Sequence, residues 1–237
     1  MKPKISFKYS LEKDAENWIY KIIGTEKGFI SVEDTHSYYT ENILEGLKKA
    51  KDKKEALAFM IQKIKSPKNS EIKFLAIHEN IKTLEKIWKT IQGDYFDILS
   101  KILKAPLYRG GFISYLSTFT LCRSNVEEGY FYISTWGNIS SQINIIFHEM
   151  HHMQFLSVYR KTLEESGLSE NQIQNLKEAL TFQLNEKDFQ AITLLPDRGY
   201  PQHKDFRKKL KKIWDKEGDF KLFLPKAIEL TKKIIKK

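Results

Sequence analysis

The first twenty residues show two kinds of hydrophobic spacing. Ile5, Phe7 and Tyr9 alternate with polar residues, which predicts a short strand. From Leu11 to Ile23 the apolar residues instead recur every three or four positions, which predicts an amphipathic helix.

Helical spacing returns between Thr40 and Leu103. Breaks are expected near Ser66-Pro67 and at Gly93-Asp94, because proline and glycine interrupt helices. The first hundred residues are therefore predicted to be mostly helical.

The pattern changes after Pro106. The segments from Phe112 to Cys122 and from Tyr130 to Trp136 are rich in β-branched and aromatic residues, which favour strands. The polar stretch from Arg123 to Gly129 between them is typical of a turn. We expect the two segments to form a β-hairpin.

A long helix is predicted after this hairpin. Gly137-Asn138 ends the strand pattern, Ser140 or Ser141 could cap a helix, and helical spacing then continues to about Arg160.

Further helices are predicted towards the C-terminus. One should run from Ser169, as the N-cap, to about Glu186, and two more should follow an irregular loop between Pro196 and Pro201. The expected fold class is α+β, mostly helical, with a hairpin or small sheet before the long helix. We interpret residues 1–237 as one domain with three parts: the mainly helical 1–105, the central 106–203 and the basic 204–237.

The composition is that of a folded protein, with 41% hydrophobic and 13% aromatic residues. Charges interrupt every apolar stretch, and the N-terminus lacks the pattern of a secretory signal. These features predict a soluble, cytoplasmic protein without a membrane span. The lone Cys122 excludes an internal disulfide and is expected to be a small buried residue.

The net charge of +10 is concentrated at the C-terminal end. The segment from Lys204 to Lys237 has 13 Lys and Arg residues against 5 Asp and Glu residues. Such a segment could bind nucleic acid. Its apolar residues nevertheless recur at helical spacing, which favours amphipathic helices with solvated lysine faces.

The segment from Phe147 to His152 contains the motif His-Glu-x-x-His. On a helix, residues four apart differ by about 40° in direction, so His148 and His152 can hold one Zn²⁺ between them. Glu149 lies beside this pair, where its carboxylate could act as a general base towards a water molecule.

The surroundings of the motif favour a metal site over a structural one. Apolar residues from Ile143 to Val158 cover nearly the whole circumference of the predicted helix, which indicates that it is buried. Buried histidines and a glutamate need strong partners, and a metal ion would supply one. The alternative is that the histidines are ordinary core residues with hydrogen-bond partners.

The motif and its position resemble those of the gluzincin metallopeptidases, in which a later helix supplies a glutamate as third zinc ligand. The metzincin continuation is excluded, since Phe155 and Val158 replace the required glycine and histidine. The resemblance, from about Phe112 to Asn185, implies that Glu178 is the third ligand and that the substrate is a peptide or protein. The Asn-Glu signature of gluzincins is absent, because Lys177 precedes Glu178.

Other residues near the motif are less suitable as ligands. Glu164 and Glu165 are expected in a polar turn after the long helix, and Glu186 at the end of its own helix. His151 points about 60° away from His148, on the side opposite His152, so we expect it to support the site or the core.

Hydrolysis also needs a donor for the negative charge that develops on the substrate carbonyl oxygen. In related enzymes a residue downstream of the third ligand supplies it, which implies Tyr200 or His203, with Arg198 as a further candidate in the same loop. Tyr159, two turns beyond the histidine pair, is a more distant possibility.

The sequence therefore predicts a zinc-dependent hydrolase with peptidase activity. The metal ligands would be His148, His152 and Glu178, and the catalytic residues Glu149, Tyr200 and His203. The first alternative is a basic, helical binding or regulatory protein whose histidine-rich helix is structural. The second is a metal-binding homologue without activity.

Overall fold

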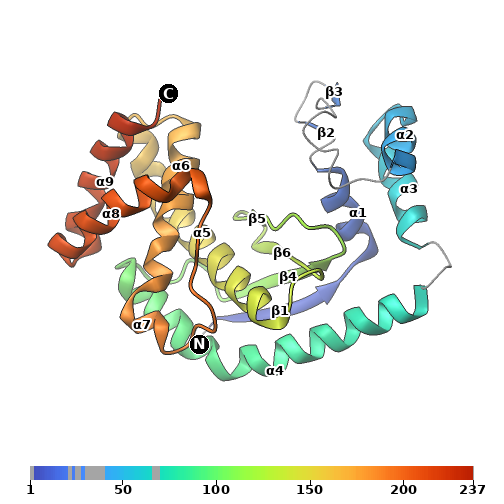
Figure 1. The fold of residues 1–237 in the computed structure, drawn as a ribbon, viewed down its shortest axis with the longest axis horizontal. Helices are drawn as coiled ribbons and strands as arrows, with labels where there is room; N and C mark the ends of the chain where they lie inside the picture. The colour runs from blue at the N-terminus through green and yellow to red at the C-terminus, as the bar shows by residue number, and fades with distance from the viewer. Residues whose placement is uncertain (1–2, 21–22, 25–27, 30–40, 66–69, 237) are drawn as a thin grey trace.

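A computed structural model describes the chain except for residues 1–2, 21–22, 25–27, 30–40, 66–69 and 237 (Figure 1). The described part is α+β and mostly helical, as expected. Its elements are β1 (Lys4–Tyr9), α1 (Leu11–Ile19), β2 (Ile23–Gly24), β3 (Gly28–Phe29), α2 (Glu41–Lys49), α3 (Lys53–Ile64), α4 (Ser70–Ile102), β4 (Gly111–Ser117), β5 (Ser124–Asn125), β6 (Tyr130–Ser134), α5 (Ile139–Glu165), α6 (Glu170–Leu180), the 3₁₀ helix η2 (Thr181–Asn185), α7 (Lys187–Gln190), the 3₁₀ helix η3 (Pro201–His203), α8 (Lys204–Glu217) and α9 (Phe220–Ile234).

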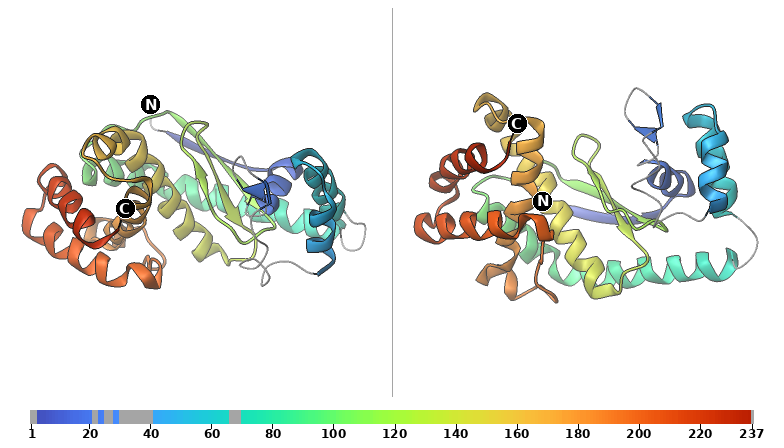
Figure 2. Two further views of the ribbon diagram at one scale, coloured as in Figure 1. Left: turned by 90° about the horizontal axis from the view of Figure 1, so that it is seen from above. Right: turned by 45° about the horizontal axis from the view of Figure 1, so that its top comes forward.

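The sheet lies between two groups of helices. Helices α1 to α3 lie at one end of the molecule, α6, α8 and α9 lie at the other, and α4 runs along the length between them (Figures 1 and 2). The strand order in the four-stranded sheet is β1-β4-β6-β5. None of the helices over the described residues has both the length and the apolar stretch that crossing a bilayer requires.

The predicted hairpin between residues 112–122 and 130–136 is wrong. Strands β4 and β6 do lie side by side, but they are parallel, with Ile113 opposite Tyr130 and Ser117 opposite Ser134. The chain reverses after β4 into the short strand β5, which pairs antiparallel with β6. The tight turn therefore lies between β5 and β6. Strand β1 pairs with the other side of β4, also in parallel.

Helix α4 is continuous through Gly93-Asp94, so the break predicted there is also wrong. A glycine inside a helix costs only about 1 kcal/mol relative to alanine. Trp88, Tyr95 and Phe96, on either side of it, are almost completely buried, and their burial outweighs that cost. The break predicted near Ser66-Pro67 lies outside the described residues.

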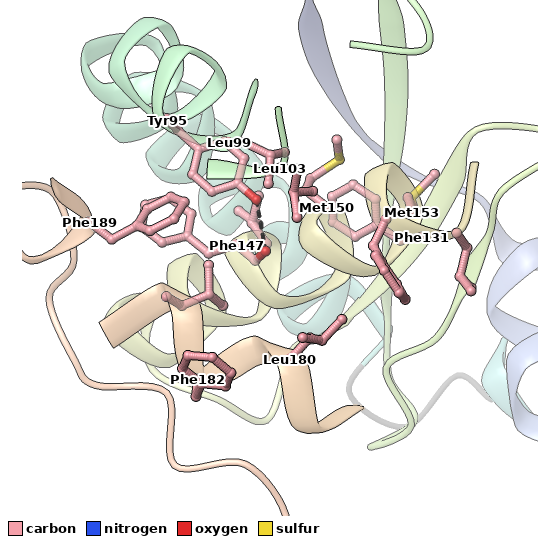
Figure 3. Packing of buried hydrophobic residues seen from close by; sticks show 14 of the residues in the cluster. Tyr95, Leu99, Leu103, Phe131, Phe147, Met150, Met153, Leu180, Phe182 and Phe189 are labelled. Carbon is pink, nitrogen blue, oxygen red and sulfur yellow. Dashed lines mark hydrogen bonds between the residues drawn. The ribbon is translucent and has the colours of Figure 1, made fainter. Parts of the chain in front are cut away.

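Helix α5 begins and ends beyond its predicted limits. Its N-cap is Asn138, whose side chain accepts a hydrogen bond from the Ser141 amide, in place of the expected Ser140 or Ser141. The helix continues past Arg160 to Glu165. Apolar residues surround it, and Tyr95 on α4 donates a hydrogen bond of 2.8 Å to the Phe147 carbonyl (Figure 3).

The other predicted helices are present with modified ends. Ser169 caps α6 as expected, but the helix tightens into η2 at Thr181 before the predicted end near Glu186. The two C-terminal helices bury apolar faces, and Phe206, Leu210, Phe223, Leu224 and Ile228 belong to the main core.

The described apolar residues form two clusters. The larger one joins the sheet, α4, α5, α6, α8 and α9. The smaller one joins α1, α2 and α3, and Phe119, just after β4, also belongs to it. The residues after β4 therefore link the N-terminal helices to the sheet. The single-domain interpretation stays a prediction.

Candidate metal centre

Two helices bring the predicted metal ligands together. His148 and His152 lie one turn apart on α5, and Glu178 lies on α6. The Glu178 Oε2 atom is 3.3 Å from His148 Nε2 and 3.1 Å from His152 Nε2. One ligand atom from each of the three residues lies within 4.8 Å of the others. The fold therefore places Glu178, the residue implied by the resemblance, beside the histidine pair.

Asp197 orients His148 from behind. The Nδ1 atom of His148 donates to Asp197 Oδ2 at 2.8 Å, which leaves Nε2 directed at Glu178. A carboxylate in this position fixes both the tautomer and the direction of a ligating imidazole.

Asp197 is itself held by three neighbours. Its Oδ1 atom accepts a hydrogen bond from Thr181 and pairs with Arg207 at 2.9 Å. Its backbone amide donates to Asn185, whose side-chain amide donates back to the Asp197 carbonyl. The loop after α7 is thus fixed to η2 and α8. Because Asp197 holds His148, these contacts also limit the movement of the His148 ring.

Gly199 allows the loop to approach Arg207. Its φ of +60° lies in the left-handed region, and an added Cβ would lie 2.4 Å from Arg207 Nη1. Only glycine meets both requirements without strain.

His151 and His152 are fully enclosed. His151 donates from Nε2 to Gln183 at 3.0 Å, so it faces η2 and stands apart from the three candidate ligands. The Nδ1 atoms of both residues are buried without a hydrogen-bond partner among the described residues. Burial lowers the pKa of His151 to about 4 and that of His152 well below its ordinary value, so both imidazoles are neutral at pH 7.

Charge pairing dominates at His148. Burial lowers the pKa of His148, but hydrogen bonds to Asp197 and Glu178 outweigh this effect and raise it to about 10. Burial would raise the pKa of Asp197, yet His148 and Arg207 lower it to about 2. In the same way, the two imidazoles overcome burial and bring the pKa of Glu178 far below its ordinary value.

Glu149 is buried beside the cluster. Burial raises its pKa, while the positive charges of His148 and Lys177 and a hydrogen bond to Ser124 oppose the rise. The Lys177 ammonium lies 2.9 Å from Glu178 Oε1. A carboxyl group beside such a cluster can accept or donate a proton in acid–base chemistry.

A cavity of about 440 Å³ opens onto His148 and Glu149. One wall is the segment after β4, a second is α5 and a third is the loop after α7. Its lining consists of Phe119, Thr120, Leu121, Cys122, Asn144, Ile145, His148, Glu149, Asp197, Arg198, Gly199 and Tyr200. Because it contains Glu149, the predicted general base, we call it the catalytic cavity below.

Of the candidate oxyanion donors, Tyr200 and Arg198 line this cavity. Burial and the charges of Glu178 and Glu149 raise the pKa of Tyr200 to about 12, so its hydroxyl is a donor at pH 7. His203 is not part of the lining, and its Nε2 atom lies 3.0 Å from Asn175 Oδ1. Tyr159 donates to the Leu103 carbonyl in the core.

The rejected glutamates are engaged elsewhere. Glu164 and Glu165 lie in the last turn of α5, not in a turn after it, and pair with Arg160 and Lys161. Glu186 lies 3.3 Å from Lys211 on α8.

Comparison with known proteins returned no match. No family model, no curated protein and no solved structure matches the chain. The assignment of the site therefore depends on its own geometry and chemistry.

Sequence reasoning missed three residues of the site. Asp197 lies 49 residues from His148 in a loop without periodicity, where only an acidic residue between Pro196 and Gly199 could have drawn attention. Lys177 gave no signal beyond its place before Glu178. Cys122, expected to be simply buried, lines the cavity, and burial raises its pKa to about 12.

Proposed function

We propose that the protein is a zinc-dependent hydrolase that cleaves peptide bonds. The observation that carries this proposal is the convergence of His148, His152 and Glu178, with their ligand atoms within 4.8 Å, beside the cavity that Glu149 lines.

The donor set suits zinc. Two imidazole nitrogens and one carboxylate oxygen are a common set for catalytic zinc, and they leave a fourth position free. Ligand atoms at about 2.0–2.1 Å from a tetrahedral ion lie roughly 3.3 Å apart. The separations of 3.1 Å and 3.3 Å between Glu178 Oε2 and the two Nε2 atoms agree with that spacing.

The residues around the cluster divide the remaining chemistry. When bound, zinc would polarise the substrate carbonyl and lower the pKa of water. Glu149 would accept a proton from the attacking water and later deliver it to the leaving amine. Tyr200, across the cavity, would donate its hydroxyl proton in a hydrogen bond to the oxygen that becomes negative. Asp197 would keep the Nε2 lone pair of His148 directed at the metal.

The choice of a peptide substrate follows the resemblance of the motif to gluzincins. The cavity of about 440 Å³ is within the range of small-molecule sites and is large enough for the side chains of a short peptide. Its lining is largely apolar, with Phe119, Leu121 and Ile145 among the contacts available to such side chains.

Metal content is the first test. Elemental analysis after purification without chelators, and again after zinc loading and dialysis, should give close to one zinc per chain. His148→Ala and His152→Ala should lose it, whereas His78→Ala, on the exposed side of α4, should keep it. Absence of zinc from the loaded protein would leave the histidines as structural core residues.

Hydrolysis is the second test. The zinc-loaded protein should cleave bonds in a mixture of diverse peptides, as followed by mass spectrometry. Glu149→Gln should retain zinc and lose this activity. If Glu149→Gln cleaved the same bonds at the same rates, the activity would not come from this site. A protein that held zinc but cleaved no peptide would refute the peptidase proposal.

A further inference from the structure

A second cavity lies on the other side of the loop that carries Asp197 and Arg198. It has a volume of about 670 Å³, and it shares those two residues with the catalytic cavity. Its lining consists of Phe182, Asn185, Asp197, Arg198, Asp205, Arg207, Lys208, Lys209, Lys211 and Lys212. We call it the basic pocket.

The floor of the basic pocket is rigid. Asn185 and Asp197 exchange two hydrogen bonds of 2.7 Å and 2.8 Å. Arg207, which is 7% exposed, pairs with Asp197 and also donates to Thr181. These polar groups are satisfied by one another, so the floor is preorganised and does not need a ligand to hold its shape.

The rim of the pocket has an excess of positive charge. Six of the lining residues are cationic and two are acidic, and the acidic Asp197 is already neutralised by Arg207. Lys211 pairs with Glu186 and Asp215. Arg198, Lys209 and Lys212 are exposed and form no ion pair among the described residues. Their charges are therefore available to a bound anion.

This arrangement arises from the amphipathic pattern of α8. Phe206 and Leu210 face the core, and the lysines between and after them line the basic pocket together with Arg198. In Figure 1 the loop that carries Arg198 passes beside α5 before the chain enters α8. A ligand in the basic pocket would therefore contact Asp197 and Arg198, which also form part of the wall of the catalytic cavity.

We propose that the basic pocket binds acidic side chains of the peptide substrate, on one side of the bond that is cleaved. The proposal rests on the proposed hydrolase function, because the shared Asp197-Arg198 wall connects the pocket to that site. Carboxylates match the charge of Arg198, Lys209 and Lys212, and electrostatic complementarity of this kind gives specificity. A nucleic acid is the competing ligand. It would require a longer basic surface than this pocket offers.

The test is a binding measurement that does not depend on turnover. Fluorescence anisotropy of labelled peptides is followed with the Glu149→Gln protein, so that cleavage does not consume the probe. A Glu-rich peptide is compared with its Gln counterpart of equal length and with a single-stranded oligonucleotide of equal charge. The Glu-rich peptide should bind about tenfold or more tightly than the Gln peptide at low ionic strength, and less tightly as salt is added.

Two double variants with the same change in net charge locate the binding site. Lys209→Glu with Lys212→Glu should weaken binding of the Glu-rich peptide by about tenfold or more. Lys221→Glu with Lys232→Glu, on exposed positions of α9 outside the basic pocket, should change it by less than about twofold.

Three results would overturn the proposal: equal binding of the Glu and Gln peptides, equal losses in the two double variants, or tighter binding of the oligonucleotide through Lys209 and Lys212. The proposed hydrolase function fails separately, through absence of zinc or of cleavage, and neither result affects the anisotropy measurement. In a protein that keeps Glu149, Lys209→Glu with Lys212→Glu should lower kcat/KM for the Glu-rich peptide and leave kcat/KM for the Gln peptide unchanged.

Discussion

Replacing Asp197 with asparagine separates the role of its charge from that of its shape. Asp197 accepts from His148 on one oxygen, and from Thr181 and Arg207 on the other. Asparagine has the same shape but only one accepting oxygen. If that oxygen faces Arg207, the amide NH₂ faces His148 Nδ1 and favours the tautomer with the proton on Nε2, the nitrogen needed for zinc. If the amide is reversed, its NH₂ group opposes the guanidinium of Arg207.

Both orientations have a measurable cost. Loss of a carboxylate that supports a metal-binding histidine typically weakens metal affinity by about 10- to 100-fold. This corresponds to roughly 1.4 to 2.7 kcal/mol. The side chains of Asp197 and Arg207 are 3% and 9% exposed, and breaking a buried pair from one side costs about 3–5 kcal/mol of stability. We expect Asp197→Asn to lower both the zinc affinity and the stability. The orientation of the amide decides which of the two falls more.

Competition with a chelating dye would give the zinc affinity, and urea unfolding in EDTA the stability without metal. Asp205→Asn is the matched control, because that side chain is 88% exposed and it should change stability by less than about 0.5 kcal/mol. Adding Arg207→Met to Asp197→Asn should recover part of the zinc affinity, since the amide oxygen could then face His148. Zinc affinity of Asp197→Asn within threefold of wild type, together with unchanged stability, would refute the proposed role of Asp197.

Four further results are expected. Because the pKa of His148 is raised to about 10 without metal, zinc must displace its proton, so zinc affinity should rise with pH from about 6.5 to 10. The same raised pKa of His148 stabilises the metal-free fold below about pH 6.5, and this contribution should disappear as the pH rises through 10. A midpoint of urea unfolding that does not change between these pH values would contradict this expectation. Gly199→Ala should lower stability by about 1–2 kcal/mol in urea unfolding, because of its positive φ and the contact with Arg207. Tyr200→Phe should keep zinc and lower kcat by about a hundredfold with little change in KM, and His203→Ala should have a much smaller effect; the reverse order would exclude Tyr200 as the donor.

Several predictions that depend on local sequence were accurate, although the N-cap of α5 is Asn138 and not Ser140 or Ser141. The strand from Lys4 to Tyr9, the buried helix of the motif and the Ser169 cap all follow from periodicity or from a side chain within four residues. In each case the determining interactions lie along one element of the chain.

Errors appeared where distant contacts decide the outcome. The pattern of β4 and β6 specifies two strands but not their relative direction, and the six-residue link to β5 changed that direction from antiparallel to parallel. At Gly93, burial of neighbouring aromatic residues against α5 outweighed the weak local preference of one glycine. Asp197 belongs to this class too, since its role depends on contacts with residues from three separate elements.

The charges around the cluster would couple a bound metal to the proposed general base Glu149. Without an ion, His148 carries a proton between Glu178 and Asp197, and burial favours the protonated form of Glu149. If His148 and His152 held a divalent cation through their Nε2 atoms, His148 would give up that proton, and the net charge beside Glu149 would rise by one. An opposite charge within about 4–6 Å lowers the pKa of a carboxyl group. The ion would therefore shift Glu149 to the ionised form, which is the form that can accept a proton from water.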